Sequence, residues 1–474
     1  MNNVTELARN ALQSSQGSVL WLDSADRPQQ TQTRCEQTQA DLVVVGAGFT
    51  GLWAALQAKE DDPLLDVVLI DSGRIGEQAS GRNGGFLSAT LTHGLVNGVA
   101  RFPKQINDLV RLGQENLDGL VASLDKHGID AGLEMTGNLI VANADWQVAG
   151  IAEFVSLLNE HGEQAELLGA EQTQAALHSP TYVAAAQVSS GEGLIDPARL
   201  TWGLADACRR LGVEIYEDTK MLSLKRSGAG ISLTIQTADA PSVEIRAGAA
   251  LLGTGAFSSP LKAVNRRVVP VYDYVLATEP LSEDQMDSIG WRGRQGVADS
   301  ANQFHYYRLT QDNRILWGGY DAVFYNWGKI DPKLDQCPES HQTLAEHFFT
   351  TFPQLEGLHF THRWGGVIDT STRFSVGFGT ALDGRVAYAV GYTGLGVGAT
   401  RFGARVCLDL LYRPDSELLK LDLVRKKMLP FPPEPLRTAG IQYTRRAIAK
   451  ADAQEGRRGG WLRTLDALGL GFDS

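Results

Sequence analysis

The chain has 474 residues, 43% of them hydrophobic and 21% charged, an ordinary globular composition and enough length for two or three domains. Its formal net charge of −12 argues against nucleic acid as the main partner. No apolar run reaches the roughly 18 residues that a membrane span needs, so none is expected.

Residues 1–40 are polar and rich in Gln, without an apolar signal core, and are expected to form an arm that docks on the surface through Trp21-Leu22. The cysteines are widely scattered and have no metal-binding spacing, which predicts reduced thiols in a cytoplasmic protein and no metal site. They are Cys35, Cys208, Cys337 and Cys407.

Residues 41–60 have the pattern of a buried strand, a glycine turn and a helix. Gly46, Gly48 and Gly51 form G-x-G-x-x-G, whose glycines permit a tight turn, close approach to a pyrophosphate and helix–strand packing. A second strand, 66–70, ends at Asp71, about 20 residues later, where a carboxylate can bind a ribose hydroxyl. The pattern predicts a dinucleotide site rather than an incidental turn, and leaves NAD and FAD both open.

The stretch 76–86 is crowded with small residues and indicates backbone passing close to a flat ligand, with a plain flexible loop as the alternative. Residues 101–189 change character and predict a second domain, with helices over 107–127 and 146–161 and a strand over 137–142.

From Gly193 the first domain is expected to resume. Asp196-Pro197 starts a helix over 198–211, and a strand follows over 213–216. Next come a small meander over 220–224, 231–237 and 243–246, and then a separate apolar strand over 249–252 that runs into Gly253-Thr254-Gly255. Such a strand end is where open α/β sheets bind ligands.

Residues 266–352 alternate in the manner of strands, over 268–278, 303–309 and 314–319, and predict a large, mostly antiparallel sheet followed by a helix over 340–352. His305 and Tyr307 should share one strand face, and Tyr306 and Arg308 the other, so only one pair can line a pocket. Packing is the alternative for the aromatic residues, and a surface or domain contact for Arg308. The candidate catalytic residues are Tyr272, Tyr274, His305, Tyr307 and Arg308.

Residues 388–400 are a strand that ends in glycines before a helix over 399–411. This repeats the logic of the first turn, with a helix N-terminus aimed at a carbonyl oxygen of the cofactor rather than at a phosphate. A glycine-rich crossing made for packing is the alternative. From Pro430 the chain becomes helical and basic, which indicates a solvated face or, less simply, a contact with an anionic partner or another subunit.

Taken together, the first glycine turn with Asp71, then ASGRNGGF, GTGAF, WGGVID and GYTGLGVGAT, resemble in their order the flavoproteins of the D-amino-acid oxidase/sarcosine oxidase superfamily. The resemblance covers most of residues 15–415. Within it, ASGRNGGF resembles the γ-glutamylputrescine oxidases and the aminophosphonate oxidoreductases, and WLD and FPPEPLR also resemble the latter.

The resemblance implies an α/β fold: a Rossmann-like FAD-binding domain built from discontinuous segments, and a substrate domain with a mixed, largely antiparallel sheet. The FAD-binding segments would be 41–100, 190–265 and 360–415, and the substrate-binding segments 101–189 and 266–359. An arm (1–40) and a C-terminal helical extension (416–474) would flank them.

The resemblance also implies which residues hold the cofactor. The first glycine turn would bind the pyrophosphate, Asp71 the ribose, and the last glycine turn the pyrimidine end of the flavin, while residues 80–87 would run past the ring. The full candidate set is Gly46, Gly48, Phe49, Thr50, Gly51, Asp71, Ser72, Ser80, Gly81, Arg82, Asn83, Gly84, Gly85, Phe86, Leu87, Met221, Gly253, Thr254, Gly255, Gly391, Thr393, Gly394, Leu395, Gly396 and Val397.

Several departures from these relatives narrow the expected chemistry. Residues 364–369 hold no Cys, so FAD is expected to be non-covalent, and residues 314–318 hold no Lys of the kind linked to oxygen reactivity. Leu395 stands where many relatives have His, and no Arg follows Phe86 to clamp a carboxylate. A simple α-amino acid substrate is therefore less expected than other amines.

The function expected from the sequence is FAD-dependent oxidation of the C–N bond of a small amine, by hydride transfer to flavin N5 and hydrolysis of the imine. The partners expected are the amine and either O₂ or an electron carrier, and the oligomeric state is left open. The alternatives are a dehydrogenase that passes electrons to a carrier, and a non-catalytic flavin-binding subunit.

Overall fold

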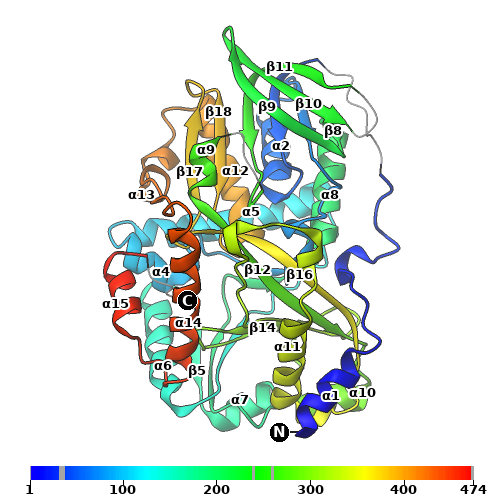
Figure 1. Cartoon of the computed structure of the whole chain (residues 1–474), viewed down its shortest axis with the longest axis vertical. Coiled ribbons are helices and arrows are strands. Elements are labelled where there is room, and N and C mark those ends of the chain that lie inside the picture. The colour runs from blue at the N-terminus through cyan, green and yellow to red at the C-terminus, as the bar shows by residue number, and fades with distance from the viewer. Residues whose placement is uncertain (1, 31–37, 238–240, 258–260, 471–474) are drawn as a thin grey trace.

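The computed structural model describes residues 2–30, 38–237, 241–257 and 261–470 (Figure 1). Two large sheets organise these ranges, one in the upper and one in the lower part of Figure 1. Cys35 lies outside the described residues. Within the described ranges, no helix combines the length and the apolar character that crossing a bilayer requires.

The first sheet has the strand order β17-β18-β11-β1-β2-β8, with β10 and β9 continuing from β11. Its centre is β1 (Gln39–Val45), which pairs in parallel with β11 (Val243–Leu252) on one side and β2 (Val67–Ile70) on the other. The other strands are β8 (Glu214–Tyr216), β9 (Thr219–Ser227), β10 (Gly230–Thr237), β17 (Gly377–Ala381) and β18 (Val386–Val390).

The division of residues 243–252 into two strands was wrong, because β11 is one continuous strand. Its first half pairs with β10 at the edge of the meander and alternates between buried and exposed positions. Its second half lies between β1 and β18 and is buried throughout, so the change in sequence pattern reflects a change in neighbours along a single strand.

Four long helices share one hydrophobic cluster on one face of the first sheet. Three belong to the expected FAD-binding segments: α2 (Phe49–Asp61), α8 (Pro197–Arg210), which Asp196 caps through the Ala198 and Arg199 amides, and α12 (Gly396–Tyr412). The fourth is α5 (Ile106–His127), expected in the substrate segment, whose Leu117 and Leu120 belong to the same cluster. The domain boundaries themselves stay a prediction.

The second sheet has the order β16-β12-β15-β14-β13-β4-β6-β5 and is antiparallel except where β13 meets β4. This confirms the expected α/β class with a mixed, largely antiparallel second sheet. Its strands are β4 (Asn138–Ala142), β5 (Ala165–Leu168), β6 (Ala184–Val188), β12 (Val268–Thr278), β13 (Gly296–Asp299), β14 (His305–Leu309), β15 (Ile315–Gly319) and β16 (Phe360–Ser371).

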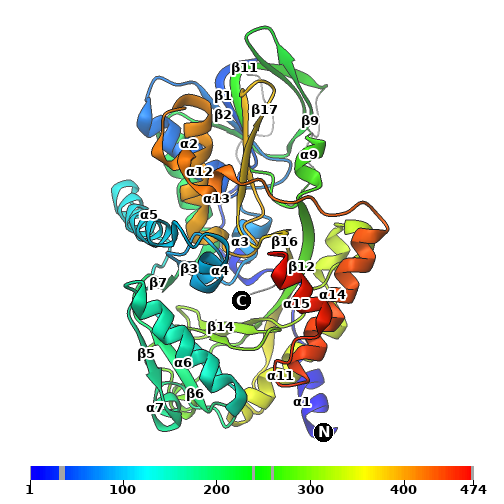
Figure 2. The same cartoon turned by 90° about the vertical axis from the view of Figure 1, so that its left-hand side faces the viewer.

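The two faces of the second sheet have different neighbours. One face packs on α11 (Pro338–Thr351) through a cluster that includes Trp317 and Phe348. The other face contributes Val275, Leu316 and Trp364 to the cluster of the first sheet. This second face therefore looks towards the first sheet, and the side view shows α3 and β3 between the two sheets (Figure 2).

The remaining described helices and short strands connect or flank the sheets. They are α1 (Asn2–Leu12), α3 (Ala79–Arg82), α4 (Gly94–Arg101), α6 (Asp145–Glu160), α7 (Ala170–Ala176), α9 (Lys262–Asn265), α10 (Glu283–Ile289), α13 (Asp422–Arg425), α14 (Leu436–Asp452) and α15 (Gly460–Ala467), with the pair β3 (Phe86–Ser88) and β7 (Glu192–Leu194).

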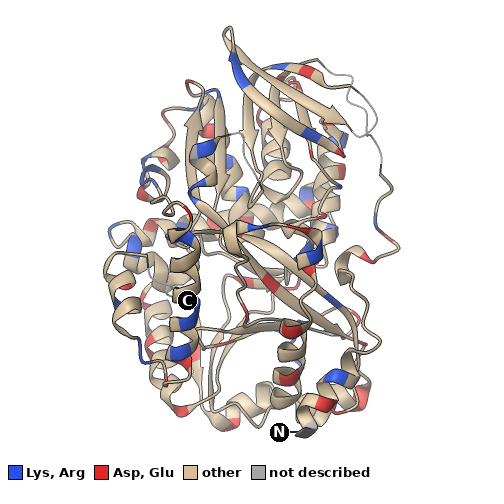
Figure 3. Cartoon of the chain, viewed as in Figure 1, with Lys and Arg blue, Asp and Glu red and all other residues tan. Residues whose placement is uncertain are grey.

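Both ends of the chain dock on the second sheet's side. Helix α1 lies along α11, where Gln342 donates a hydrogen bond to the Thr5 carbonyl. At the other end, Asp452 at the end of α14 accepts hydrogen bonds from the backbone amides of Asn302 and Gln303. Acidic and basic residues are interspersed over both halves of the molecule (Figure 3). Within the basic extension, Arg445 forms an ion pair with Asp321 at 2.9 Å.

Candidate active site

The first glycine turn connects β1 to α2 and packs against the end of β11. Gly46 has a φ of +106°, and a Cβ at this position would lie 2.5 Å from the Gly253 carbonyl oxygen. A Cβ on Gly51 would lie 1.9 Å from the Gly46 carbonyl oxygen. These approaches are possible only without side chains, so the turn and the start of α2 form a bare backbone cradle.

Two other chain segments close around this cradle. The amide of Phe49, at the start of α2, donates a hydrogen bond of 3.0 Å to the Ser80 hydroxyl. The Thr50 hydroxyl donates to the Tyr392 hydroxyl at 3.2 Å. The structure therefore brings together the candidate cofactor residues of the first turn, the 80–87 segment and the 391–397 segment.

Asp71 ends β2 beside the first turn. Its carboxylate accepts hydrogen bonds from the amides of Ala47 at 2.6 Å and Gly73 at 2.9 Å. Burial raises the pKa of Asp71 to about 6, and these amides oppose the rise. The hydroxyl of Thr254, just after β11, is buried and has no hydrogen-bond partner among the described residues, as expected of a group awaiting a ligand. The residues fit a dinucleotide cofactor.

The last glycine turn is held by Asp369 of β16. Its carboxylate accepts a hydrogen bond from the Gly391 amide at 2.6 Å, and its carbonyl accepts one from the Thr393 amide at 3.2 Å. Burial raises the pKa of Asp369 to about 6. Helix α12 begins at Gly396, three residues before the predicted start at Ala399, so its free amide groups lie at this turn. Sequence reasoning did not select Asp369, although it ends the WGGVID motif.

The loop of residues 82–85 is held from outside by three side chains. The Trp364 indole donates to the Arg82 carbonyl at 2.9 Å, and the Trp21 indole donates to the Asn83 carbonyl at 2.9 Å. Arg308 donates to the carbonyls of Gly85 at 3.3 Å and Ile195 at 2.8 Å. The apolar anchor of the arm, Trp21, thus supports the loop that we expect beside the flavin ring.

Four of the five candidate catalytic residues lie on the face of the second sheet that packs against α11. Tyr272, Tyr274 and Tyr307 are buried in its hydrophobic cluster. His305 contacts His347 of α11 at 2.9 Å between ring nitrogens, and its other nitrogen contacts Asp299 at 2.6 Å. These side chains point away from the glycine turns, and their surroundings match the alternative in which the aromatic residues serve packing.

Arg308 lies on the face that looks towards the glycine turns, but its guanidinium is already engaged. It is 1% exposed and donates to the backbone carbonyls of Gly85, Ile195 and Leu309. Burial lowers its pKa to about 10, so it stays charged at neutral pH. Its contacts match the domain-contact alternative rather than a clamp for a substrate anion.

The same face presents Tyr306 of β14 and Asp273 of β12, which were not among the candidates. The Tyr306 hydroxyl donates to the Asp273 carboxylate at 2.5 Å, and its ring meets Phe86 edge-on at 5.6 Å between centroids. The two-residue alternation of each strand was the available signal, but it does not tell which face the cofactor loop covers.

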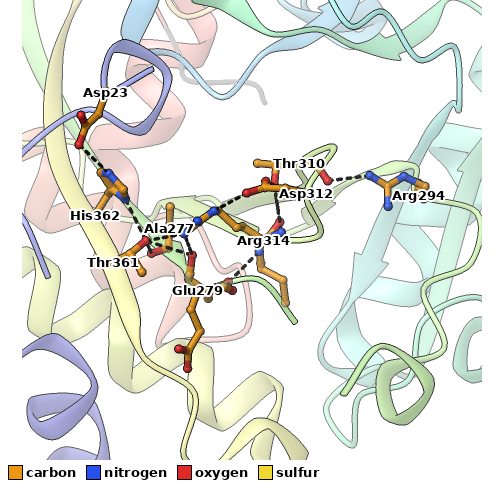
Figure 4. A network of polar contacts seen from close by, with 11 residues as sticks. Asp23, Ala277, Glu279, Arg294, Thr310, Asp312, Arg314, Thr361 and His362 are labelled. Atoms are coloured by element: carbon orange, nitrogen blue, oxygen red, sulfur yellow. Dashed lines mark hydrogen bonds and ion pairs between the residues drawn. The ribbon is translucent and has the colours of Figure 1, made fainter. Parts of the chain in front are cut away.

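Arg314 directly precedes β15, the strand in which some relatives carry a Lys. It belongs to a network of polar contacts at the turn between β14 and β15 (Figure 4). It donates to Asp312 at 2.7 Å and to the Thr361 hydroxyl at 2.9 Å. The network continues through His362 to Asp23 of the arm, at 3.2 Å. Arg314 therefore ties the hairpin to the arm.

Ser72 and Met221 complete the candidate cofactor residues. Ser72 is exposed directly after Asp71. Met221 lies in β9, whose first residue, Thr219, donates its amide to the Asp71 carbonyl at 2.6 Å. Both residues are therefore near the Asp71 end of the site. Among the described residues, no group of three or more His, Cys, Asp or Glu side chains is arranged to hold a metal.

Comparison with known proteins agrees with this geometry. Residues 41–410 match the family model described as FAD dependent oxidoreductase (DAO). The chain is 32% identical over 404 residues to the gamma-glutamylputrescine oxidoreductase of Escherichia coli K12, covering 84% of this chain and 90% of that protein. It is 22% identical to sarcosine oxidase subunit beta of Rhodobacter capsulatus, covering 73% of this chain and 78% of that protein.

Among solved structures, the glycine oxidase of Geobacillus kaustophilus superposes with a TM-score of 0.66 at 17% identity. The match covers 82% of this chain and 99% of that one. At this identity the likeness shows the fold alone.

Proposed function

This chain belongs to the family of FAD-dependent oxidoreductases, and on that premise we propose that it oxidises the C–N bond of a small primary or secondary amine. The amine would be an amino acid derivative, a polyamine derivative or an aminophosphonate. One observation carries the proposal: glycine turns from three distant chain segments meet at one place, opposite the Asp273 and Tyr306 face of the second sheet. The 32% identity to a gamma-glutamylputrescine oxidoreductase supports an amine substrate.

When bound, FAD supplies an acceptor for the hydride that leaves the carbon beside the nitrogen. The residues of the chain hold the cofactor and orient it towards the substrate. In this proposal the turn at Gly46–Gly51 receives the pyrophosphate on bare amides, and Asp71 accepts from the ribose. The N-terminus of α12 offers amide groups to a carbonyl of the ring system. Water then hydrolyses the released imine.

We further propose that FAD is held non-covalently and that the protein works in the cytoplasm. Residues 364–369 carry no Cys. The described cysteines Cys208, Cys337 and Cys407 are free; Cys208 and Cys407 are buried in the core of the first sheet, and Cys337 is partly buried before α11. Denaturation in acid should therefore release all of the flavin into the supernatant. Flavin that stays with the precipitated protein would contradict non-covalent binding.

A dehydrogenase is the second candidate, because the positions of β15 that look towards the glycine turns are Leu316 and Gly318, and neither can offer a positive charge to reduced oxygen species. The two candidates differ in one product. An oxidase releases one peroxide for each amine oxidised in air, whereas a dehydrogenase needs an added dye or carrier.

The deciding experiment is anaerobic reduction of the purified yellow protein with a panel of amines, amino acids and aminophosphonates. The flavin absorbance near 450 nm should bleach with at least one amine, on the order of seconds or faster at saturation. A protein that cannot be loaded with FAD, or a loaded protein that no amine bleaches, would remove the enzymatic proposal and leave a flavin-binding subunit.

A further inference from the structure

Asp273 is a carboxylate without a positively charged partner among the described residues. One oxygen accepts from Tyr306 at 2.5 Å, and the other accepts from the Tyr274 amide at 2.9 Å. Its side chain lies deep in the protein, yet the residue keeps a partly accessible surface. We infer from this that the accessible part of Asp273 borders a space on this face of the sheet.

That internal space borders the loop expected to pass the flavin ring. A Cβ on Gly84 would lie 2.8 Å from the Tyr306 ring, and Phe86 meets the same ring edge-on. On the other side, Gly366 of β16 stands opposite Asp273 in the sheet and faces the Arg82 side chain. Asp273 therefore looks into the space between the second sheet and residues 82–86.

The positive charges nearest this space are already engaged. Arg82 donates to Asp335 at 2.5 Å and to the carbonyls of Glu77 and Gly365. Within the described part of the chain, Arg308 donates to backbone carbonyls only. An anionic group in this space would be repelled by the Asp273 carboxylate, whereas a cation would form an ion pair with it.

We propose that Asp273, held by Tyr306, binds the substrate's ammonium group and accepts one of its protons, so that the substrate is an amine without a carboxylate beside the reacting carbon. This inference rests on the proposed function. The N–H bond of the ammonium breaks, an O–H bond forms on Asp273, and the nitrogen keeps the electron pair that assists hydride loss.

An ionised carboxylate alone would favour the charged ammonium, so the transfer depends on the enclosure. Burial disfavours both charges of the pair and therefore favours neutral amine with neutral acid. Burial raises the pKa of Asp273 to about 6, and the Tyr306 hydroxyl and the Tyr274 and Gly319 amides oppose the rise. Asp321, after β15, also raises it, although Asp321 is itself paired with Arg445.

The first test measures the rate of anaerobic flavin reduction against pH in the FAD-loaded wild type and in Asp273→Asn. At pH 7 the variant should be slower by roughly 100-fold, the usual scale of general-base catalysis, and should approach the wild type above about pH 10, where the amine arrives neutral. Asp321→Asn is the control, because it removes a neighbouring carboxylate that is already paired with Arg445. Its rate of flavin reduction should stay within about threefold of the wild-type rate. The proposal would be overturned if Asp273→Asn slowed flavin reduction equally at every pH, or did not slow it at pH 7.

The second test needs no variant and no turnover, because tert-butylamine has no hydrogen on the carbon beside nitrogen. Binding of tert-butylamine to the wild type is measured from the change in the flavin spectrum. It is compared with the binding of tert-butanol and of pivalate, which have a similar shape but no positive charge. The ammonium should bind at least about tenfold more tightly than either, a preference of about 1.4 kcal/mol. Equal binding, or tighter binding of pivalate, would overturn the inference even if amines bleach the flavin.

Discussion

The guanidinium carbon of Arg308 lies 5.5 Å from the centre of the Trp21 ring, and both side chains hold the same loop. Trp21 comes from the arm and bonds the Asn83 carbonyl, while Arg308 comes from β14 and bonds the Gly85 carbonyl. The loop expected beside the flavin is thus fixed jointly by the arm and by the second sheet.

We expect Arg308→Lys to destabilise the protein and to weaken FAD binding. A lysine keeps the charge but cannot reach the Gly85, Ile195 and Leu309 carbonyls at once, so buried acceptors lose their donors. The free energy of unfolding should fall by roughly 2–4 kcal/mol, the scale of one or two charge-assisted hydrogen bonds in the interior. Urea denaturation gives this value. Arg111→Lys, on the exposed side of α5, is the control and should change stability by less than about 0.5 kcal/mol.

Trp21→Phe isolates the contribution of the arm. The ring remains to pack against Arg308, but the hydrogen bond to the Asn83 carbonyl is lost, at a cost of about 1 kcal/mol. We expect the dissociation constant of FAD, measured by flavin fluorescence, to rise several-fold. Trp461→Phe also removes an indole hydrogen bond, to Thr444 in the C-terminal extension, and should leave FAD affinity unchanged. A similar effect in both variants would argue against a specific role for the arm.

The local part of the site could be predicted from the sequence because its chemistry lies within short segments. The strand–turn–helix at residues 41–60 and the acid at Asp71 occupy about 30 consecutive residues, and each needs a specific residue type for local reasons. The strand at 268–278 was predicted with its observed ends, since β-branched and aromatic residues make up most of this long segment.

The long-range part could not be predicted. Alternation in β14 separated Tyr306 and Arg308 from His305 and Tyr307, but the side on which the glycine loop lies depends on how two sheets pack. In the same way, the bond between Trp21 and Asn83 spans 62 residues and leaves no periodic signal in either segment. Four of the five candidate catalytic residues therefore lie on the face that packs against α11, away from the glycine loop.

Glu192 predicts a specific pH dependence of stability. Burial raises its pKa to about 8 from an ordinary value of 4.5, although the Ser88 hydroxyl donates to it at 2.6 Å. Between these values the folded state binds more protons than the unfolded state, so this group makes the free energy of unfolding decrease as pH rises from about 4.5 to about 8. Glu192→Gln mimics the neutral acid and should become progressively more stable relative to the wild type across that range.

Urea denaturation of the flavin-free protein at pH 5 and pH 8 measures the Glu192 effect. Glu166→Gln, at an exposed position of β5, is the control and should show a difference from the wild type that does not change between the two pH values. A constant offset in Glu192→Gln would mean that Glu192 titrates alike in the folded and unfolded states.

Gly51→Ala should abolish tight FAD binding and destabilise the first sheet. The new methyl group would lie 1.9 Å from the Gly46 carbonyl oxygen and 3.1 Å from the Val44 side chain, so α2 must move away from β1. We expect a loss of at least about 3 kcal/mol, the upper part of the range for overpacking, because the obstacle is backbone. Gly150→Ala is the matched control: it lies on the exposed side of α6 with open space around it, and should gain roughly 0.5–1 kcal/mol from helix propensity. If Gly51→Ala retains wild-type stability and flavin content, the close contact of α2 with the first turn is not what shapes the cofactor cradle.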